Sequence, residues 1–130
     1  MHLHAVTLVV PDYDAAIAFY VDILGFELRA DIPLSTEKRW VLVAPPGGRT
    51  QLLLAKAASA DQRAAIGNQT GGRVGFFLHS DDFDADYARL KSAGVSFEEA
   101  PRRESYGSVA VFRDPFGNRW DLLSLAQQPT

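Results

Sequence analysis

The sequence contains no cysteine among its 130 residues. A chain without thiols forms no disulfide, ligates no zinc or iron–sulfur cluster through thiolate and has no cysteine nucleophile. Only three histidines are present, so imidazole groups are scarce as well. Any chemistry must therefore depend on a few histidine, carboxylate, tyrosine, arginine or glutamine side chains.

The sequence also lacks an excess of basic residues and a long apolar run. Its 13 Lys and Arg residues stand against 16 Asp and Glu residues, for a net charge of −3, and no basic stripe of the kind that drives nucleic-acid binding is present. The start of the chain, residues 1–4, has no features of a secretory signal, and no stretch reaches the roughly 18 apolar residues of a membrane span. We expect a cytoplasmic protein that binds neither nucleic acid nor membrane.

What is present suits a folded chain. Hydrophobic residues make up 47% and aromatic residues 11% of the sequence, which is too apolar, at this small net charge, for a disordered chain. The length is enough for one ordinary domain or for two very small modules that share a core.

An internal repeat decides between these two alternatives. The segment Asp12–Ala15 (DYDA) recurs as Asp82–Ala85 (DFDA), and Pro45–Leu53 (PPGGRTQLL) recurs as Pro115–Leu123 (PFGNRWDLL), both at an offset of 70 residues. Two matches at one offset and in the same order indicate two modules of the same fold within one chain.

Each repeat predicts the order strand, helix and three strands. An aspartate precedes each helical stretch as an N-cap, and Gly25 and Gly94 stand where the helices end. In the first module the strands are expected at 4–10, from 26, at 39–44 and at 50–55, and in the second at 73–79, 95–98, 108–112 and 119–125. Module 1 thus spans residues 1–56, an Ala-rich and then Gly-rich linker residues 57–72, and module 2 residues 73–126.

Neither module is able to bury its sheet alone, because about 55 residues with a single helix leave one sheet face uncovered. We therefore expect one α+β domain over residues 1–130, in which two tandem βαβββ modules form a curved mixed sheet around a central cleft. Ligands occupy concave sites at the junctions of modules, so this cleft is the expected binding site for a small molecule, completed within one chain or across a dimer.

The repeat carries two motifs that resemble a known superfamily. The segments FYVDILGFEL (19–28), after the N-capped helix, and DPFGNRWDLL (114–123), in the final hairpin, are similar to those of the vicinal oxygen chelate superfamily of glyoxalases, bleomycin-resistance proteins and extradiol dioxygenases. The resemblance implies the glyoxalase/bleomycin-resistance/dioxygenase fold and a homodimer. In its metal-using members it further implies a divalent ion such as Zn, Ni, Mn or Fe, held by the first and last strands of each module.

Only some of the metal-ligand positions that the resemblance implies hold a residue able to bind a metal. Gln51 and Asp121 stand at the two last-strand positions, whereas the first-strand positions fall on Ala5 and Gly75, which cannot bind a metal. His4 is one residue away, and strand alternation directs it to the opposite face unless a β-bulge intervenes. The metal candidates are therefore His4, Gln51 and Asp121, and the sequence favours a protein without the full metal site.

Strand alternation places other side chains in the expected cleft with Gln51 and Asp121. Phe77 and His79 share their face, and His79 is the candidate general base or hydrogen-bond partner of a ligand, the alternative being a histidine packed at a strand end. Trp40 and Tyr106 begin the third strands, where an aromatic ring is able to stack on a planar ligand, although Tyr106 also suits a packed rim position. Arg73 is a further ligand-binding candidate, and its fixed positive charge repels a metal.

Three functions follow from these residues. The first is a small-molecule-binding protein that holds an aromatic or amphipathic ligand. The second is a divergent metal-dependent lyase, isomerase or dioxygenase that uses His4, Gln51 and Asp121, and the third is an accessory module whose cleft mediates assembly. Whether the protein is an enzyme is left open by the sequence, as is the identity of the ligand.

Overall fold

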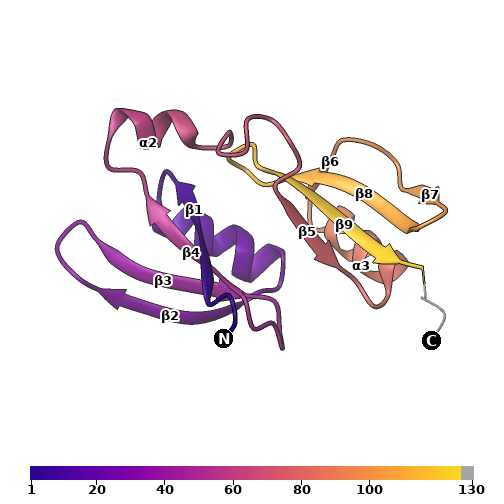
Figure 1. Ribbon diagram of the computed structural model, residues 1–130, viewed down its shortest axis with the longest axis horizontal. Helices are drawn as coiled ribbons and strands as arrows, with labels where there is room; N and C mark the ends of the chain where they lie inside the picture. The colour runs from indigo at the N-terminus through magenta and orange to yellow at the C-terminus, as the bar shows by residue number, and fades with distance from the viewer. Residues whose placement is uncertain (127–130) are drawn as a thin grey trace. The chain divides into compact units, whose positions relative to one another are not determined.

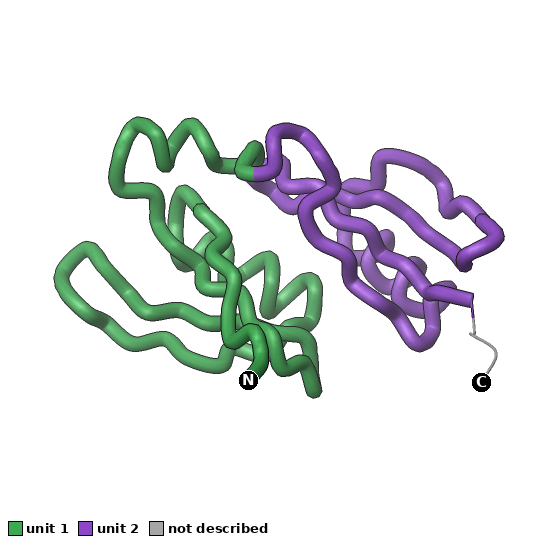
Figure 2. The backbone as a smooth tube through the Cα atoms, in the orientation of Figure 1, with its two compact units in different colours: residues 1–69 green, residues 70–130 purple. Residues whose placement is uncertain are grey.

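The computed structural model describes residues 1–126 of the chain (Figure 1). The chain divides into two compact units, unit 1 comprising Met1–Gln69 and unit 2 comprising Thr70–Thr130 (Figure 2), and the boundary falls inside the expected linker. Unit 1 contains a sheet of four strands and unit 2 a sheet of five, both mixed. The predicted α+β class is therefore confirmed, with the strands arranged in two mixed sheets.

Unit 1 has the predicted order of elements. Its sheet has the strand order β1-β4-β3-β2, in which β1 runs parallel to β4 and the other pairs are antiparallel. A helix follows the first strand, and a second, short helix follows the last. The elements are β1 (Ala5–Val10), α1 (Tyr13–Ile17), η1 (Ala18–Ile23), β2 (Glu27–Pro33), β3 (Arg39–Ala44), β4 (Gln51–Lys56) and α2 (Ala60–Ala65).

The first helix begins and ends where the sequence predicts, with Gly25 at a φ of 90° after its last turn, but its second half is not α-helical. The Asp12 carboxylate accepts a hydrogen bond from the backbone N–H of Ala15 at 2.8 Å, which is an N-cap. The helix then widens into a π-helical segment, η1, in which the Leu24 N–H donates to the Phe19 carbonyl at 2.8 Å. Apolar periodicity does not distinguish a π-turn from an α-turn, so this segment was not predicted.

The two faces of the unit 1 sheet differ in burial. Val43 on β3 and Leu54 on β4 are fully buried on the face that carries α1. Leu53, Trp40 and Thr7 lie on the opposite face, where Leu53 is half-buried and Trp40 and Thr7 are exposed. Leu42 on this second face is 6% exposed, so the face is covered at Leu42 and open at Trp40.

Unit 2 repeats this order with one additional strand. Its sheet has the order β5-β9-β8-β6, and β7 also pairs with β8. Two short strands replace the single strand expected at 95–98, because the seven-residue β8 pairs with β6 near its end and with β7 near its start, and Pro101, which lacks an N–H, lies between them. The elements are β5 (Phe76–His79), α3 (Phe83–Ser92), β6 (Ser96–Phe97), β7 (Arg102–Glu104), β8 (Gly107–Arg113) and β9 (Arg119–Leu125).

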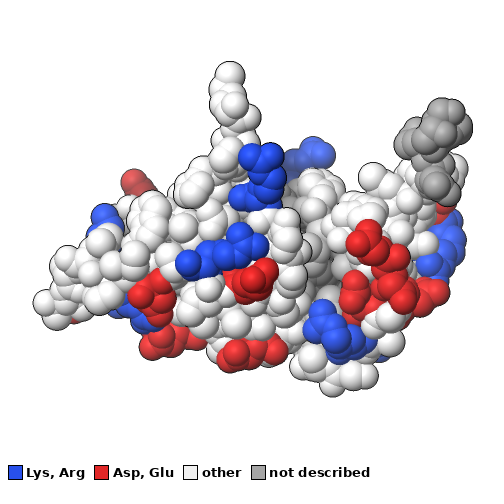
Figure 3. All heavy atoms as spheres, turned by 90° about the horizontal axis from the view of Figure 1, so that it is seen from below, with Lys and Arg blue, Asp and Glu red and all other residues white. Residues whose placement is uncertain are grey.

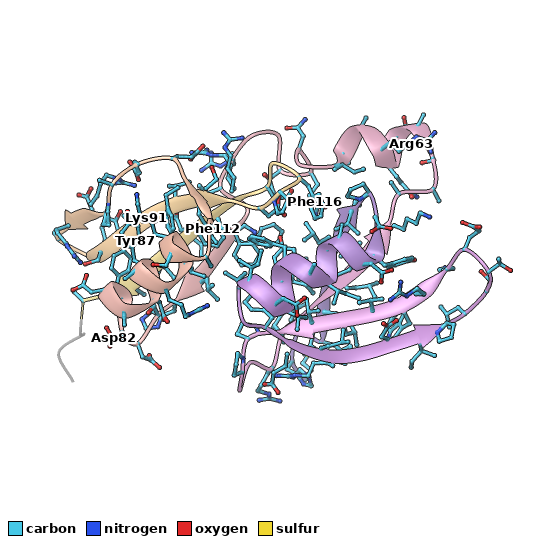
Figure 4. The ribbon with its side chains drawn as sticks, turned by 180° about the vertical axis from the view of Figure 1, so that it is seen from behind. Arg63, Asp82, Tyr87, Lys91, Phe112 and Phe116 are labelled. Atoms are coloured by element: carbon cyan, nitrogen blue, oxygen red, sulfur yellow. The ribbon has the colours of Figure 1, made fainter. Side chains whose placement is uncertain are left out.

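A continuous array of aromatic rings fills unit 2. Trp120 stacks on Phe76 at 4.7 Å and on Phe112 at 5.8 Å between ring centroids. Phe97 contacts Phe112 at 5.7 Å and Tyr87 at 4.6 Å. Tyr87 lies on α3 and Phe112 on β8 (Figure 4), so the array connects the helix to the sheet.

The segment that leaves β4 is partly helical, as expected for the linker. The Ser59 hydroxyl caps α2 by accepting from the Gln62 N–H at 3.1 Å. Farther on, the Gln69 side-chain amide accepts from the Val9 N–H at 2.9 Å and donates to the Thr7 carbonyl at 2.8 Å. This amide bonds to the edge of β1 as a neighbouring strand would. Within residues 1–126, no helix is long and apolar enough to cross a membrane.

Candidate functional site

A pocket of about 650 Å³ opens in unit 1 where β4 ends. This volume is in the range of pockets that hold small organic molecules. Strands β1, β3 and β4, helices α1 and α2, the β2–β3 connection and the segment between β4 and α2 all contribute to its wall. The residues that line it are Thr7, Tyr13, Leu34, Glu37, Lys38, Arg39, Trp40, Leu53, Leu54, Ala55, Lys56, Ala57, Ala58 and Gln62.

Trp40 is the largest aromatic side chain of the pocket. It is the second residue of β3 and pairs with Ile32 of β2, and 37% of it is exposed. Leu34 and Leu53 also line the pocket, and Leu34 is 54% exposed. An indole in a largely apolar wall provides a surface on which a planar ring is able to stack.

Arg39 holds one side of the pocket rigid. Its guanidinium donates two hydrogen bonds to Asp31, at 2.8 and 3.0 Å, and one to Asp14 at 2.9 Å, and its Cζ lies 5.1 Å from the centre of the Tyr13 ring. These hydrogen bonds raise the pKa of Arg39, and Arg39 holds the pKa of Asp31 below its ordinary value. The arginine next to Trp40 is therefore a fixed structural group.

The remaining polar groups of the pocket are more loosely held. The Lys56 Nζ lies 3.7 Å from an oxygen of Glu37, and 82% of the Glu37 side chain is exposed. The Gln62 Oε1 accepts from the Ala58 N–H at 2.7 Å. Sequence reasoning identified Trp40 but not the lysines or Gln62, because the β2–β3 connection, the end of β4 and α2 have no pattern that indicates a pocket.

His4 and Gln51 lie next to each other in unit 1. Gln51 is 8% exposed on β4 opposite Ala5, and its Nε2 is 3.5 Å from Nε2 of His4. His4 itself precedes β1 and is exposed. The structure therefore brings two of the three metal candidates together, and neither of them lines the pocket.

Asp121 and Phe77 are neighbours in the unit 2 sheet. Asp121 on β9 pairs with Phe77 on β5, which is 66% exposed, and with Val111 on β8. One oxygen of Asp121, Oδ1, is buried and has no hydrogen-bond partner among the described residues. Burial raises the pKa of Asp121, and the positive charges of Arg102 and Arg119 oppose this effect.

The other predicted site residues lie at the margins of unit 2. His79 ends β5, its Nδ1 3.7 Å from a carboxylate oxygen of Asp81, and half of its side chain is exposed. Tyr106 lies in the turn before β8 and is 50% exposed, and Arg73 is exposed before β5. Their role in ligand binding, and the placement of the ligand in a cleft between the modules, stay predictions.

The donor groups do not fit the divalent ion that the resemblance implies. His4 and Gln51 supply one imidazole and one neutral amide, which is a weak ligand, and Asp121 supplies one carboxylate. Over residues 1–126, no cluster of three or more His, Cys, Asp or Glu side chains is arranged to hold a metal ion.

Two carboxyl groups of unit 2, Asp121 and Glu98, have pKa shifts of opposite sign, so we expect them to change the free energy of unfolding with pH in opposite directions. Burial raises the folded-state pKa of Asp121, so its charged form destabilises the fold as pH rises through that pKa. Arg119 and Arg113 lower the folded-state pKa of Glu98, so its charged form stabilises the fold and this contribution is lost as pH falls. We expect Asp121→Asn to raise and Glu98→Gln to lower the free energy of unfolding at pH 7.

Urea unfolding of both variants at pH 7 and at about pH 3 measures this. Both differences from the parent protein should shrink at the lower pH, where the two carboxyl groups become protonated in the unfolded chain. A destabilised Asp121→Asn variant at pH 7 would contradict the effect that we assign to burial.

Several known proteins are similar to this chain over most of its length. A family model described as the Glyoxalase/Bleomycin resistance protein/Dioxygenase superfamily matches residues 2–122. A curated protein of Shewanella frigidimarina is 51% identical over 122 residues, which cover 92% of this chain and 90% of that protein. YurT of Bacillus subtilis is 30% identical, with 98% of this chain and all of that protein covered.

Two solved structures share the fold of this chain and are each 35% identical to it in sequence. The crystal structure of UcmS2 has a TM-score of 0.82 at 35% identity and covers 95% of this chain and 97% of its own. TnmS3, described as an antibiotic binding protein from Streptomyces sp. CB03234, has a TM-score of 0.78 at 35% identity, with 97% of each chain covered.

Proposed function

The chain belongs to the glyoxalase/bleomycin resistance protein/dioxygenase superfamily, and from this membership we propose that it is a small-molecule-binding protein. The ligand is aromatic or amphipathic and occupies the unit 1 pocket. Binding does not depend on the full metal site of the superfamily, because the first-strand positions hold Ala5 and Gly75. The description of TnmS3 as an antibiotic binding protein supports a binding role over a catalytic one.

The observation that carries this proposal is Trp40 in the wall of the pocket. An indole that is 37% exposed retains a ring surface available to a ligand, and its neighbours Leu34 and Leu53 are apolar. Removal of this surface from water on binding is favourable by about 25 cal/mol per Å², and an aromatic pair adds about 0.5–1.5 kcal/mol. The pocket therefore favours a planar ring over a purely polar solute.

A titration with N-phenyl-1-naphthylamine, a neutral aromatic probe, tests the proposal. We expect the probe emission to rise on binding to the full chain, and Trp40→Ala to weaken the affinity about tenfold, which corresponds to the loss of about 1.4 kcal/mol. Trp40→Phe should retain most of the affinity, because it keeps an aromatic ring in the wall.

Leu28→Ala is the matched control, since Leu28 is 43% exposed on β2 and does not line the pocket. Phe77→Ala and His79→Ala test the ligand contacts predicted in unit 2. A probe that does not bind, or that binds equally to Trp40→Ala, would reject the pocket as the site. A loss confined to the unit 2 variants would move the site to that unit.

We also propose that the protein is cytoplasmic and forms a homodimer; the resemblance to the superfamily supports the homodimer. Sedimentation equilibrium of the full chain measures the assembly state, and a monomer at concentrations well above those of the binding experiments would contradict it.

A further inference from the structure

We infer that the ligand of the unit 1 pocket carries an anionic group next to its aromatic ring, and that the ammonium groups of Lys56 and Lys38 bind it. This inference rests on the proposed binding function and adds the chemical class of the ligand. It depends on the two lysines that line the pocket, because their ammonium groups are at most loosely paired.

Cationic side chains outnumber anionic ones among the residues that line the pocket, although the chain as a whole is acidic. The whole sequence has a net charge of −3, and on the face shown in Figure 3 the Lys and Arg side chains lie close to Asp and Glu side chains. Three cationic residues line the pocket, Lys38, Arg39 and Lys56, together with the single carboxylate of Glu37. A positive site of this kind favours an anionic ligand over a cationic one.

Arg39 is not available to a ligand. Asp31 and Asp14 together accept three hydrogen bonds from its guanidinium, and their two negative charges exceed its single positive charge. What remains at the pocket is two lysines and one carboxylate. Outside the Arg39 cluster, the ammonium groups that line the pocket therefore outnumber the carboxylates by one.

The two lysines are able to bind an incoming anion at little cost. The contact between Lys56 and Glu37 is long, at 3.7 Å, and joins side chains that are 40% and 82% exposed. Surface pairs of this kind contribute about 0–1 kcal/mol, so a ligand anion can replace Glu37. The Lys38 ammonium has no hydrogen bond or ion pair within residues 1–126.

The arrangement selects an amphipathic molecule. Trp40 and Leu53 provide the apolar part of the wall, and the lysines provide the charge on the same pocket. An ion pair beside an apolar wall is stronger than one in bulk water, because the effective dielectric constant is lower there. The ligand class that fits is a planar aromatic compound with a carboxylate, phenolate or sulfonate group.

Two probes with one aromatic skeleton test this class. 8-Anilinonaphthalene-1-sulfonate is anionic, whereas N-phenyl-1-naphthylamine has the same rings without the sulfonate. We expect Lys56→Gln and Lys38→Gln each to weaken sulfonate binding about threefold, and the double variant to weaken it about tenfold, while the affinity for the neutral probe stays unchanged. High salt should weaken binding of the sulfonate only.

Lys91→Gln is the matched control, because Lys91 lies on α3 in unit 2 (Figure 4). Equal affinities of the double variant and the parent chain for the sulfonate, or equal losses for both probes, would overturn the inference. If the neutral probe binds in a manner that depends on Trp40 while the sulfonate shows no dependence on lysine, the inference fails and the proposed function stands. If neither probe responds to Trp40→Ala, the proposed function itself fails.

Discussion

Substitution of Asp114 by Ala is expected to lower the free energy of unfolding of unit 2 by about 3–5 kcal/mol. Asp114 is 4% exposed at the start of the turn between β8 and β9. Its carboxylate accepts from the backbone N–H groups of Phe116 and Asn118, both at 2.9 Å, and from the side-chain amide of Asn118 at 2.7 Å. Removal of the carboxylate leaves three donors without this acceptor, one of them on a buried backbone.

Urea unfolding followed by tryptophan fluorescence in a Trp40→Phe background measures this effect, because Trp120 in unit 2 is then the remaining tryptophan. Asp114→Asn is the conservative variant, and it should recover part of the loss because its amide oxygen still accepts from the backbone. Asp22→Ala removes an exposed carboxylate in unit 1 and should change the free energy by less than about 0.5 kcal/mol. A loss of similar size at both positions would show that the turn is not special.

Substitution of Phe112 by Ala should also destabilise the chain by about 3–5 kcal/mol. Phe112 is fully buried, and its ring stands between those of Trp120 and Phe97 in the aromatic array. Truncation to alanine removes the buried ring and its contacts with the neighbouring rings, and it leaves a cavity. The neighbouring strands cannot close this cavity, because the β8–β9 ladder holds them in register.

The measurement is again urea unfolding, with Phe112→Leu and Phe77→Ala as comparisons. Phe112→Leu fills most of the volume and should cost about half as much as Phe112→Ala. Phe77 is 66% exposed on the open face of β5, so Phe77→Ala should cost less than about 1 kcal/mol. If the two alanine variants are equally stable, the aromatic array does not carry the stability of unit 2.

The turn at Asp114 shows how far local sequence reasoning reaches. The segment Asp114–Asn118 predicts a tight turn from its Pro, Gly and Asn residues, and the structure contains that turn, with Gly117 at a φ of 103°. A glycine adopts this backbone conformation at little cost, whereas other residues do so rarely. The buried bonds of the Asp114 side chain depend on the arrangement of the folded turn and were not predicted.

The strands of unit 2 show the limit of local sequence reasoning. The alternation along 119–125 predicts β9 with the observed bounds, because its two faces meet different environments. The segment between Val95 and Glu104 has no such alternation over a useful length. Its division into β6 and β7 is decided by pairing with β8 on the other side of the loop.

By itself, the sequence determined the repeat, the two βαβββ modules, the helix caps and the absence of thiol chemistry. Each of these depends on residue type and local spacing, which are properties of the chain. The tertiary structure alone decided that Trp40, Lys38, Lys56 and Gln62 line one pocket, and that an oxygen of Asp121 is buried without a partner. These features arise from segments far apart in the sequence, and only strand pairing and packing bring such segments together.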